Sequence, residues 1–288
     1  MLLLDKHFHV HRTNYQDGYK VTAGSLEEGL KGIHDEQKIL VLNDPHNPAG
    51  NLYTEMDLGE IAEVCRRNET LILADEIYAM TTYDFDGFTS LGKIYPEGTF
   101  VSNGLSKGWS AGGYRFGYLV LPEGFSKELR EAFVKVAGTV YTNVSTPTQY
   151  AAVEAFRESD DMEKYFQVTR GIHEMIGTYL SREIGSIKGV RSTEPKGGFY
   201  FYLDFNELSN DLKRNRIGDS NSLSGALLAH PYHFAAVTGD ACLLDKDDFG
   251  ARIAFVDYDG KAAFDDYVIN PPRRSRNGRI LSSGTPRE

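Results

Sequence analysis

Four short groups of polar and charged residues have the types and spacing to do chemistry on a bound cofactor. They lie at residues 43–50, 75–78, 106–107 and 113–118. Taken singly, each group has an ordinary structural explanation as a turn, a helix cap, a surface dipeptide or a solvated loop. Their order, each following a short apolar run, indicates one shared site, since ligands of open α/β sheets bind beyond the carboxyl ends of the strands.

The residue types in these groups match what pyridoxal 5'-phosphate requires of a protein. This cofactor needs a lysine amine that holds it covalently and moves a proton, a carboxylate beside its pyridine nitrogen, donors to its phenolate oxygen, and a guanidinium for its phosphate. Lys107 is the expected catalytic amine, and Asp75 is the expected carboxylate. Asn47 and Tyr78 are the expected phenolate ligands, and Arg115 is the expected phosphate ligand.

The elements that would hold these groups alternate between short apolar runs and amphipathic helices. Between the first two runs, Thr54 begins an expected helix in which apolar residues recur at helical spacing. Strands that alternate with helices predict an α/β fold with a mostly parallel sheet, covered on both faces. The expected strands lie at residues 39–42, 71–74, 100–101 and 118–121.

The pattern changes in the second half of the chain. A long amphipathic stretch begins near Asp160, and the strand signals at residues 199–205 and 252–256 no longer alternate strictly with helices. This arrangement predicts a smaller α+β domain. We therefore expect a cofactor-binding large domain at residues 1–158, a small C-terminal domain at 159–270, and a disordered tail at 271–288 that is rich in Pro, Arg, Ser and Gly.

Composition argues against several classes of protein. The 288 residues carry 31 Lys and Arg against 41 Asp and Glu, and the net charge of −10 argues against nucleic acid as a partner because phosphate binding needs a basic face. No apolar run approaches the ~20 residues of a membrane span, so no membrane partner is expected. Cys65 and Cys242 form no disulfide framework, which favours a reducing compartment and a cytoplasmic location.

Three histidines near the start of the chain could bind a metal ion. His7, His9 and His11 alternate, so on a strand their side chains would share one face. No carboxylate or cysteine completes the set, and an incidental strand face is the simpler interpretation. We therefore predict that the protein binds no metal.

Taken together, these motifs resemble those of the class I/II aminotransferases, the fold type I pyridoxal-phosphate enzymes. The resemblance runs from about Asn14 to Tyr267. The residues that carry it are Asn-Pro-Ala-Gly at 47–50, Asp-Glu-Ile-Tyr at 75–78, Ser-Lys at 106–107, Gly-Tyr-Arg-Phe-Gly-Tyr at 113–118, Gly-Gly-Phe-Tyr at 197–200 and Val-Thr-Gly-Asp at 237–240.

The resemblance implies a function and further site residues. It implies ping-pong transfer of an amino group between an L-amino acid and a 2-oxo acid, in a homodimer whose sites lie at the subunit interface. Arg252 falls where the family holds the substrate α-carboxylate. Gly104 stands where many members have a phosphate-binding serine, so Ser106 is expected to substitute in part.

The chain also departs from the family pattern. Members carry roughly a third more chain before the position of Met1, including a phosphate-binding turn and an aromatic residue that stacks on the cofactor. The resemblance therefore implies a large domain that lacks its N-terminal part, weak cofactor binding by these 288 residues alone, and aggregation through open sheet edges. Trp109 is expected to be structural rather than a replacement for the stacking residue.

The resemblance leaves the substrate and the reaction open. Residues 138–146 contain no basic side chain, which disfavours aspartate or glutamate as the amino donor, and Tyr141 either lines the side-chain pocket or packs at a subunit interface. A lyase or cyclising enzyme would share the lysine motif. A catalytically inactive fragment that kept the fold is the remaining alternative.

Overall fold

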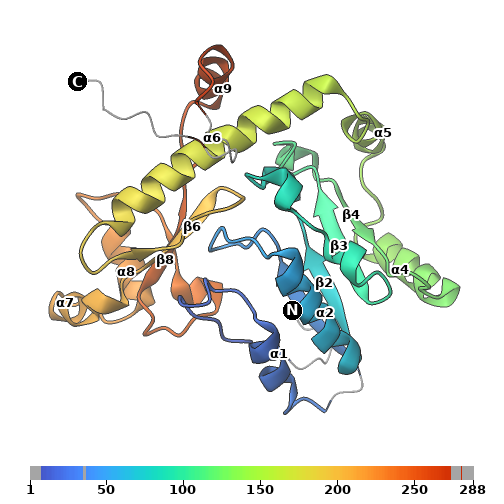
Figure 1. Ribbon diagram of the computed structural model, residues 1–288, viewed down its shortest axis with the longest axis horizontal. Helices are drawn as coiled ribbons and strands as arrows, with labels where there is room; N and C mark the ends of the chain where they lie inside the picture. Colours follow the sequence, from blue (N-terminus) through green and yellow to red (C-terminus); the bar gives the residue numbers. More distant parts are fainter. Residues whose placement is uncertain (1–7, 35–36, 274–279, 281–288) are drawn as a thin grey trace.

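The computed structural model describes residues 8–34, 37–273 and 280, and it contains two four-stranded sheets connected by a long helix (Figure 1). The first sheet has the strand order β1-β2-β3-β4, and the second has the order β5-β6-β8-β7. The connecting helix is α6 (Asp160–Gly185). Across residues 8–34 and 37–273, we find no helix with the length and apolar content that a membrane crossing requires.

The first sheet is mostly parallel, as the alternation of strands and helices predicts. Its first three strands run parallel, and the fourth is antiparallel to the third. The register places Asn43 beside Asp75 and Asp75 beside Ser102, so these three polar residues line up at the carboxyl edge of the sheet. The strands are β1 (Lys38–Asn43), β2 (Thr70–Asp75), β3 (Thr99–Gly104) and β4 (Gly117–Val120).

One face of this sheet is covered by three helices. The helix α2 (Glu55–Arg67) begins at Thr54, whose side chain accepts a hydrogen bond from the backbone of Asp57 while the Asp57 carboxylate accepts one from the backbone of Thr54. This capping box fixes the start of α2 as the sequence predicts. The smaller helices α1 (Ala23–Leu30) and α3 (Leu91–Ile94) lie beside it. The core under them includes Leu42, Leu58, Ile61, Ile72, Ala74 and Leu91.

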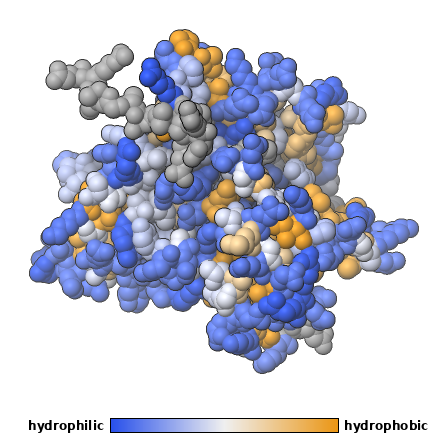
Figure 2. All heavy atoms as spheres, in the orientation of Figure 1, coloured by the Kyte–Doolittle hydropathy of each residue, from blue (hydrophilic) through white to orange (hydrophobic). Residues whose placement is uncertain are grey.

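The opposite face is covered only in part, so the prediction of two covered faces is wrong for the described residues. Phe100 packs against Phe133 of α4 (Lys127–Val140), with ring centroids 5.9 Å apart. On β1, however, the side chains of Ile39 and Val41 are 59% and 66% exposed because no described helix packs over them. Figure 2 likewise shows apolar side chains at the surface over α4.

The second sheet is entirely antiparallel and packs against the C-terminal half of α6. Ile176, Leu180 and Ile184 of that helix contact the buried Phe201 and Ile253 of the sheet. The strands are β5 (Arg191–Ser192), β6 (Tyr200–Asp204), β7 (Val237–Thr238) and β8 (Gly250–Ala254). The remaining helices are α5 (Thr146–Ala155), α7 (Ser209–Arg214), α8 (Ser220–Leu228) and α9 (Gly260–Ile269).

The helix α6 contacts both halves of the molecule. Near its N-terminus, Phe166 packs against Trp109, with ring centroids 5.2 Å apart, and the Tyr165 hydroxyl donates to Ser110 Oγ at 2.7 Å. Trp109 also donates from its indole nitrogen to a backbone carbonyl of α5 at 2.9 Å, which fits the structural role expected for it. The two halves also meet where Thr82, which follows β2, forms a β-bridge with Gly197, which precedes β6.

Two of the sequence-based predictions fall largely outside the described residues. Of the expected disordered tail, only residues 271–273 and 280 are described, and His7 of the histidine set is not described. Among the described residues, no group of three or more His, Cys, Asp and Glu side chains could hold a metal ion. The division at residue 158 stays a prediction.

Candidate active site

The candidate site begins at the carboxyl edge of the first sheet. Ser102 Oγ donates to Asp75 Oδ1 at 3.2 Å, which holds the carboxylate at the end of β2. Asn43 Nδ2 donates to the backbone carbonyl of Asp75 at 2.8 Å. The side chains at or near the ends of β1, β2 and β3 therefore form one polar row, at the edge where the sequence predicts ligand binding.

The loop after β1 brings Asn47 into this row. The backbone N–H of Asn47 donates to Asn43 Oδ1 at 2.6 Å, so one asparagine side chain connects the loop to β2. Farther along the loop, Gly50 has a positive φ of 71°, and a Cβ there would lie 2.3 Å from the backbone oxygen of Tyr200. Glycine is therefore required where the loop meets the second sheet.

Arg252 on β8 reaches across from the second sheet to Asn47. Its Nη1 donates to Asn47 Oδ1 at 3.0 Å, and its guanidinium carbon lies 4.4 Å from the ring centroid of Tyr200. Among the residues that the structure describes, the buried Nε of Arg252 has no hydrogen-bond partner. A buried guanidinium N–H without an acceptor suits an anionic ligand, because leaving it unsatisfied is costly.

Tyr78 lies between the two sheets and is only 3% exposed. Its hydroxyl donates to the hydroxyl of Tyr200 at 3.5 Å, and its ring meets those of Phe199 and Tyr200 edge to face. Burial is the main cause that raises the pKa of Tyr78 above its ordinary value, and the hydrogen bond with Tyr200 adds to it. Tyr78 therefore keeps its proton and can act as a hydrogen-bond donor.

Lys107 is half-buried against these aromatic rings. Its Nζ lies 5.6 Å from the ring centroid of Tyr78 and 5.6 Å from that of Phe199. The lysine sits in a tight turn after β3, in which the Ser110 N–H donates to the Lys107 carbonyl at 2.9 Å. Its neighbour Gly108 approaches Met80 so closely that a Cβ there would lie 2.5 Å from the methionine Cβ. The backbone that carries the lysine is thus packed closely against the 3-10 helix Ala79–Thr81, which follows β2.

The expected phosphate ligands lie beside this group but are not connected to it by a described contact. Arg115 is exposed, adopts a positive φ of 56°, and donates from Nη1 to the carbonyl of Gly112 at 2.9 Å. Ser106 is half-buried, and a Cβ on Gly112 would lie 3.5 Å from its backbone oxygen. Both residues therefore lie next to Gly112, and the guanidinium bonds the carbonyl of that glycine.

The structure gives contacts within the site to four residues to which the sequence assigned no individual role. Asn43 and Ser102 end or nearly end predicted strands, so their place at the carboxyl edge could have identified them. Phe199 and Tyr200 belong to a motif that the resemblance quoted without a role. Their contacts with Lys107, Tyr78 and Arg252 depend on packing between segments that lie far apart in the chain.

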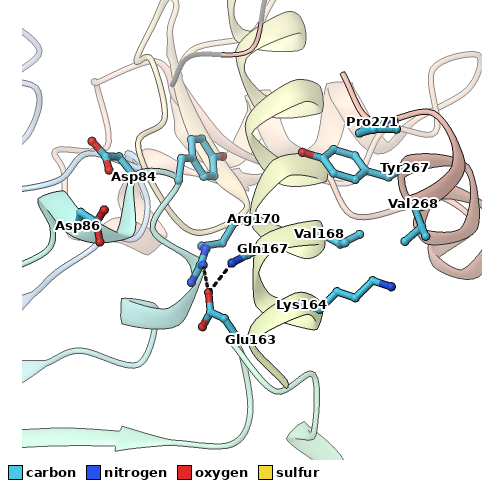
Figure 3. A pocket seen from close by; sticks show the side chains of 11 residues that line it. Asp84, Asp86, Glu163, Lys164, Gln167, Val168, Arg170, Tyr267, Val268 and Pro271 are labelled. Carbon is cyan, nitrogen blue, oxygen red and sulfur yellow. Dashed lines mark hydrogen bonds and ion pairs between the residues drawn. The ribbon is translucent and has the colours of Figure 1, made fainter. Parts of the chain in front are cut away.

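A separate cleft of about 580 Å³ lies between the loop after Thr82, the helix α6 and the end of α9 (Figure 3). On its floor, Glu163 Oε1 accepts hydrogen bonds from Arg170 at 3.0 Å and from Gln167 at 3.1 Å. The cleft is lined by none of the predicted site residues. We therefore place the candidate active site at the edge of the first sheet and not in this cleft.

Comparison with solved structures confirms the fold expected from the resemblance. An aspartate aminotransferase from Thermus thermophilus with maleate superimposes with a TM-score of 0.72 at 23% identity, covering 89% of this chain and 62% of that chain. An aromatic aminotransferase from Pyrococcus horikoshii OT3 gives a TM-score of 0.73 at 24% identity, covering 88% and 63%. At such identities the likeness shows the fold alone.

Sequence comparison identifies the family. The chain is 31% identical over 201 residues to the aspartate aminotransferase of Bacillus sp. (strain YM-2), which covers 67% of this chain and 47% of that protein. It is 30% identical over 194 residues to the asparagine–oxo-acid transaminase of Streptococcus mutans serotype c, covering 66% and 47%. The chain thus spans about half the length of these curated relatives. The profile of the family "Aminotransferase class I and II" matches residues 5–255, and the chain belongs to that family.

Proposed function

We propose that this chain carries the lysine site of a pyridoxal-phosphate-dependent aminotransferase, which transfers an amino group between an L-amino acid and a 2-oxo acid. The observation that carries the proposal is a path of contacts that joins the backbone carbonyl of Asp75, at the end of β2, to the lysine amine. In order, the path runs through Asp75, Asn43, Asn47, Arg252, Tyr200, Tyr78 and Lys107.

The chemistry of this donor set fits the cofactor. Arginine can only donate, so the contact from Arg252 fixes Asn47 Oδ1 as the acceptor and leaves Asn47 Nδ2 as a donor. Tyr78 is a second donor, and both suit a phenolate oxygen. Asp75, held by Ser102, supplies a negative charge that would keep a pyridine nitrogen protonated. We propose Ser106 and Arg115 as phosphate ligands, for which Arg115 has to turn away from Gly112.

When bound, pyridoxal phosphate supplies an electron sink that stabilises negative charge on the Cα of the amino acid. Lys107 would hold the cofactor through its amine and, after the amino acid displaces it, would move the proton from Cα. Arg252 would orient the α-carboxylate by a two-point contact, since the planar guanidinium matches two carboxylate oxygens. The rings of Tyr78 and Phe199 would flank the amine while it does so.

We extend the proposal to the organisation of the protein. Residues 1–158 and 159–270 would act as large and small domains, and the working unit would be a cytoplasmic homodimer. Support for the compartment comes from Cys65 and Cys242, which are both free. Tyr141, in the loop that bears on substrate choice, is 65% exposed and therefore accessible to a partner subunit or a substrate.

The test combines covalent mapping with a turnover assay. The chain is incubated with pyridoxal phosphate, reduced with borohydride and digested, and we expect pyridoxyl-lysine at position 107. Lys127→Arg, which changes an exposed lysine, is the matched control. It should carry the label at Lys107, as the wild type does. Pyridoxyl label on another lysine, with Lys107 unlabelled, would overturn the assignment of the site.

The turnover assay separates the alternative reactions. 2-Oxo acid formation from an amino acid is measured with and without an acceptor 2-oxo acid. Formation that requires the acceptor supports transamination. Formation beyond one equivalent per site without it, in a protein labelled at Lys107, indicates lyase chemistry, because a transaminase stops once its cofactor holds the amino group. Label without any 2-oxo acid formation indicates a chain that kept only the binding site.

A further inference from the structure

We propose that Tyr200 is a positioning residue that couples the carboxylate-binding side chain of Arg252 to the cofactor-facing hydroxyl of Tyr78. The inference rests on the proposed function, because it assigns a role within that same site. Tyr200 is the first residue of β6 and is buried. Its ring contacts the guanidinium, and its hydroxyl contacts the phenol, so one side chain reaches both parts of the site.

The ring of Tyr200 sets the plane of the Arg252 guanidinium. The antiparallel register pairs Tyr202 with Arg252 and Tyr200 with Ala254, so Tyr200 is the diagonal neighbour of the arginine across the sheet. At 4.4 Å from the ring centroid, the guanidinium is attracted by the π face. With Nη1 bonded to Asn47, the flat group has two fixed contacts, and the unpartnered Nε faces a defined direction.

The hydroxyl of Tyr200 orients the hydroxyl of Tyr78. The Tyr78 hydroxyl donates a hydrogen bond to the Tyr200 hydroxyl. If Tyr78 instead donates to a phenolate, its oxygen becomes an acceptor, and the Tyr200 hydroxyl is the donor already in place. Such a chain of two hydrogen bonds strengthens the donation from Tyr78, because each bond polarises the next. Tyr200 would therefore make Tyr78 a better ligand for the phenolate.

The chain offers a matched control on the same strand. Tyr202 lies two residues from Tyr200, so its side chain emerges on the same face of β6. Its hydroxyl lies against Gly239 and Gly250, where a Cβ would be 2.6 Å and 2.4 Å away, and among the described residues it has no hydrogen-bond partner. Tyr202→Phe thus removes a buried tyrosine hydroxyl that does not contact Tyr78 or Arg252.

The first experiment tests the ring without any cofactor. The full chain is labelled with ¹⁵N-arginine, and the Nε–H resonance of Arg252 is assigned by its loss in Arg252→Lys. Stacking on Tyr200 should move this resonance by the ring current. We expect Tyr200→Phe and Tyr202→Phe to keep the shifted resonance and Tyr200→Leu to lose the shift. A resonance that stays in place in a folded Tyr200→Leu protein would overturn the role of the ring.

The second experiment tests the hydroxyl in the protein loaded with pyridoxal phosphate. The visible absorbance of the lysine-bound cofactor is titrated with pH. A weaker donor stabilises the negative charge of the phenolate less. The phenolate then attracts the proton on the nitrogen that links the cofactor to Lys107 more strongly, and the pKa of that nitrogen rises. Tyr200→Phe should therefore raise the spectroscopic pKa by about one unit, the size of one hydrogen bond, while Tyr202→Phe should titrate as the wild type does. An unchanged titration in Tyr200→Phe would overturn the role of the hydroxyl.

Kinetics with an amino acid donor then separate the two roles. Tyr200→Phe should change KM less than about threefold, because the ring under Arg252 remains, whereas Tyr200→Leu should raise KM about tenfold. Equal KM values in the two variants would contradict a role for the ring. If the wild type takes up no cofactor at Lys107, the proposed function fails together with the hydroxyl's role, and the arginine resonance still decides the role of the ring.

Discussion

Asn43 and Asn47 are joined by a 2.6 Å hydrogen bond in which the side chain of the first accepts the backbone N–H of the second. The same Asn43 side chain donates to the backbone carbonyl of Asp75 at 2.8 Å. One amide therefore satisfies backbone groups of the loop and of the neighbouring strand. This arrangement ties the position of Asn47, and through it the contact to Arg252, to the end of β2.

We predict that Asn43→Ala lowers the free energy of unfolding by about 1–3 kcal/mol, because it removes the acceptor of the Asn47 N–H and one of the two donors to the Asp75 carbonyl, which keeps the Asp44 N–H. Urea unfolding followed by circular dichroism measures the loss. Asn270→Ala is the control, since among the described residues its side chain bonds an exposed carboxylate, and it should change stability by less than about 0.5 kcal/mol. Equal effects of the two changes would contradict the connecting role of Asn43.

We predict that Asp75→Asn leaves stability nearly unchanged and lowers transamination by about 10²–10⁴-fold, a range typical of losing one proton-handling group. The amide oxygen can still accept from Ser102, but a neutral amide cannot keep a pyridine nitrogen protonated. The unfolding midpoint and kcat are measured together. Asp86→Asn, at an exposed residue of the 3-10 helix Phe85–Gly87, should leave both unchanged. Turnover near the wild-type value in Asp75→Asn would contradict its assignment.

We predict that Asp44 makes the protein less stable as pH rises. Burial is the main cause that raises the pKa of Asp44 to about 7, while a hydrogen bond from the Tyr53 N–H opposes the shift. The folded state therefore holds a proton that the unfolded state releases near pH 4, so stability falls between about pH 4 and 7. With a pKa raised to about 7, the free energy of unfolding that is lost over this pH range is about 4 kcal/mol.

Asp44→Asn tests this directly, because its amide oxygen can still accept from Tyr53. We expect the variant to be more stable than the wild type at pH 8, with a difference that shrinks as pH falls toward 4. Chemical unfolding at several pH values measures the difference. A gap between the two proteins that is constant with pH would show that Asp44 does not titrate in this range.

We predict the opposite pH dependence for His173 on α6. Its ring lies against those of Phe199 and Phe255, with centroids 5.7 Å and 6.4 Å away, and burial lowers its pKa to about 4. The unfolded state takes up a proton near pH 6.5, whereas the folded state does not until about pH 4. Stability is therefore lost as pH falls through this window.

His173→Gln should weaken this acid sensitivity, and His230→Gln, at an exposed histidine, should not. Proton NMR of the histidine rings gives a direct check, since the His173 resonance should stay unshifted down to about pH 5. Titration of that resonance near pH 6.5 in the folded protein would refute the prediction.

The sequence predicts the first sheet and the row of polar residues at its edge, because both depend on local patterns. Apolar runs mark β1, β2 and β3, and the residues that follow them include Asn47, Asp75 and Lys107. The parallel register then brings these residues to one edge. Their individual roles stay predictions, since no described contact tests them.

The contacts that complete the site could not be predicted from local patterns. Tyr78 and Tyr200 are 122 residues apart, and their hydroxyls meet only because β6 packs against the turn after β2. The orientation of Arg115 likewise depends on a left-handed backbone at that residue, which its sequence context does not specify. The exposure of one face of the first sheet could not be predicted either. The apolar run of β1 is the same whether or not a helix packs over Ile39.

The helix α6 has a consequence for how the molecule unfolds. Its first turns pack on Trp109, two residues after the site lysine, and its last turns form part of the core of the second sheet. Loss of structure in the turn after β3 or in the second sheet would therefore remove apolar contacts from this shared helix. Folding of the two sheets is therefore cooperative, and the turn that holds Lys107 derives part of its order from a core that lies on the other side of the molecule.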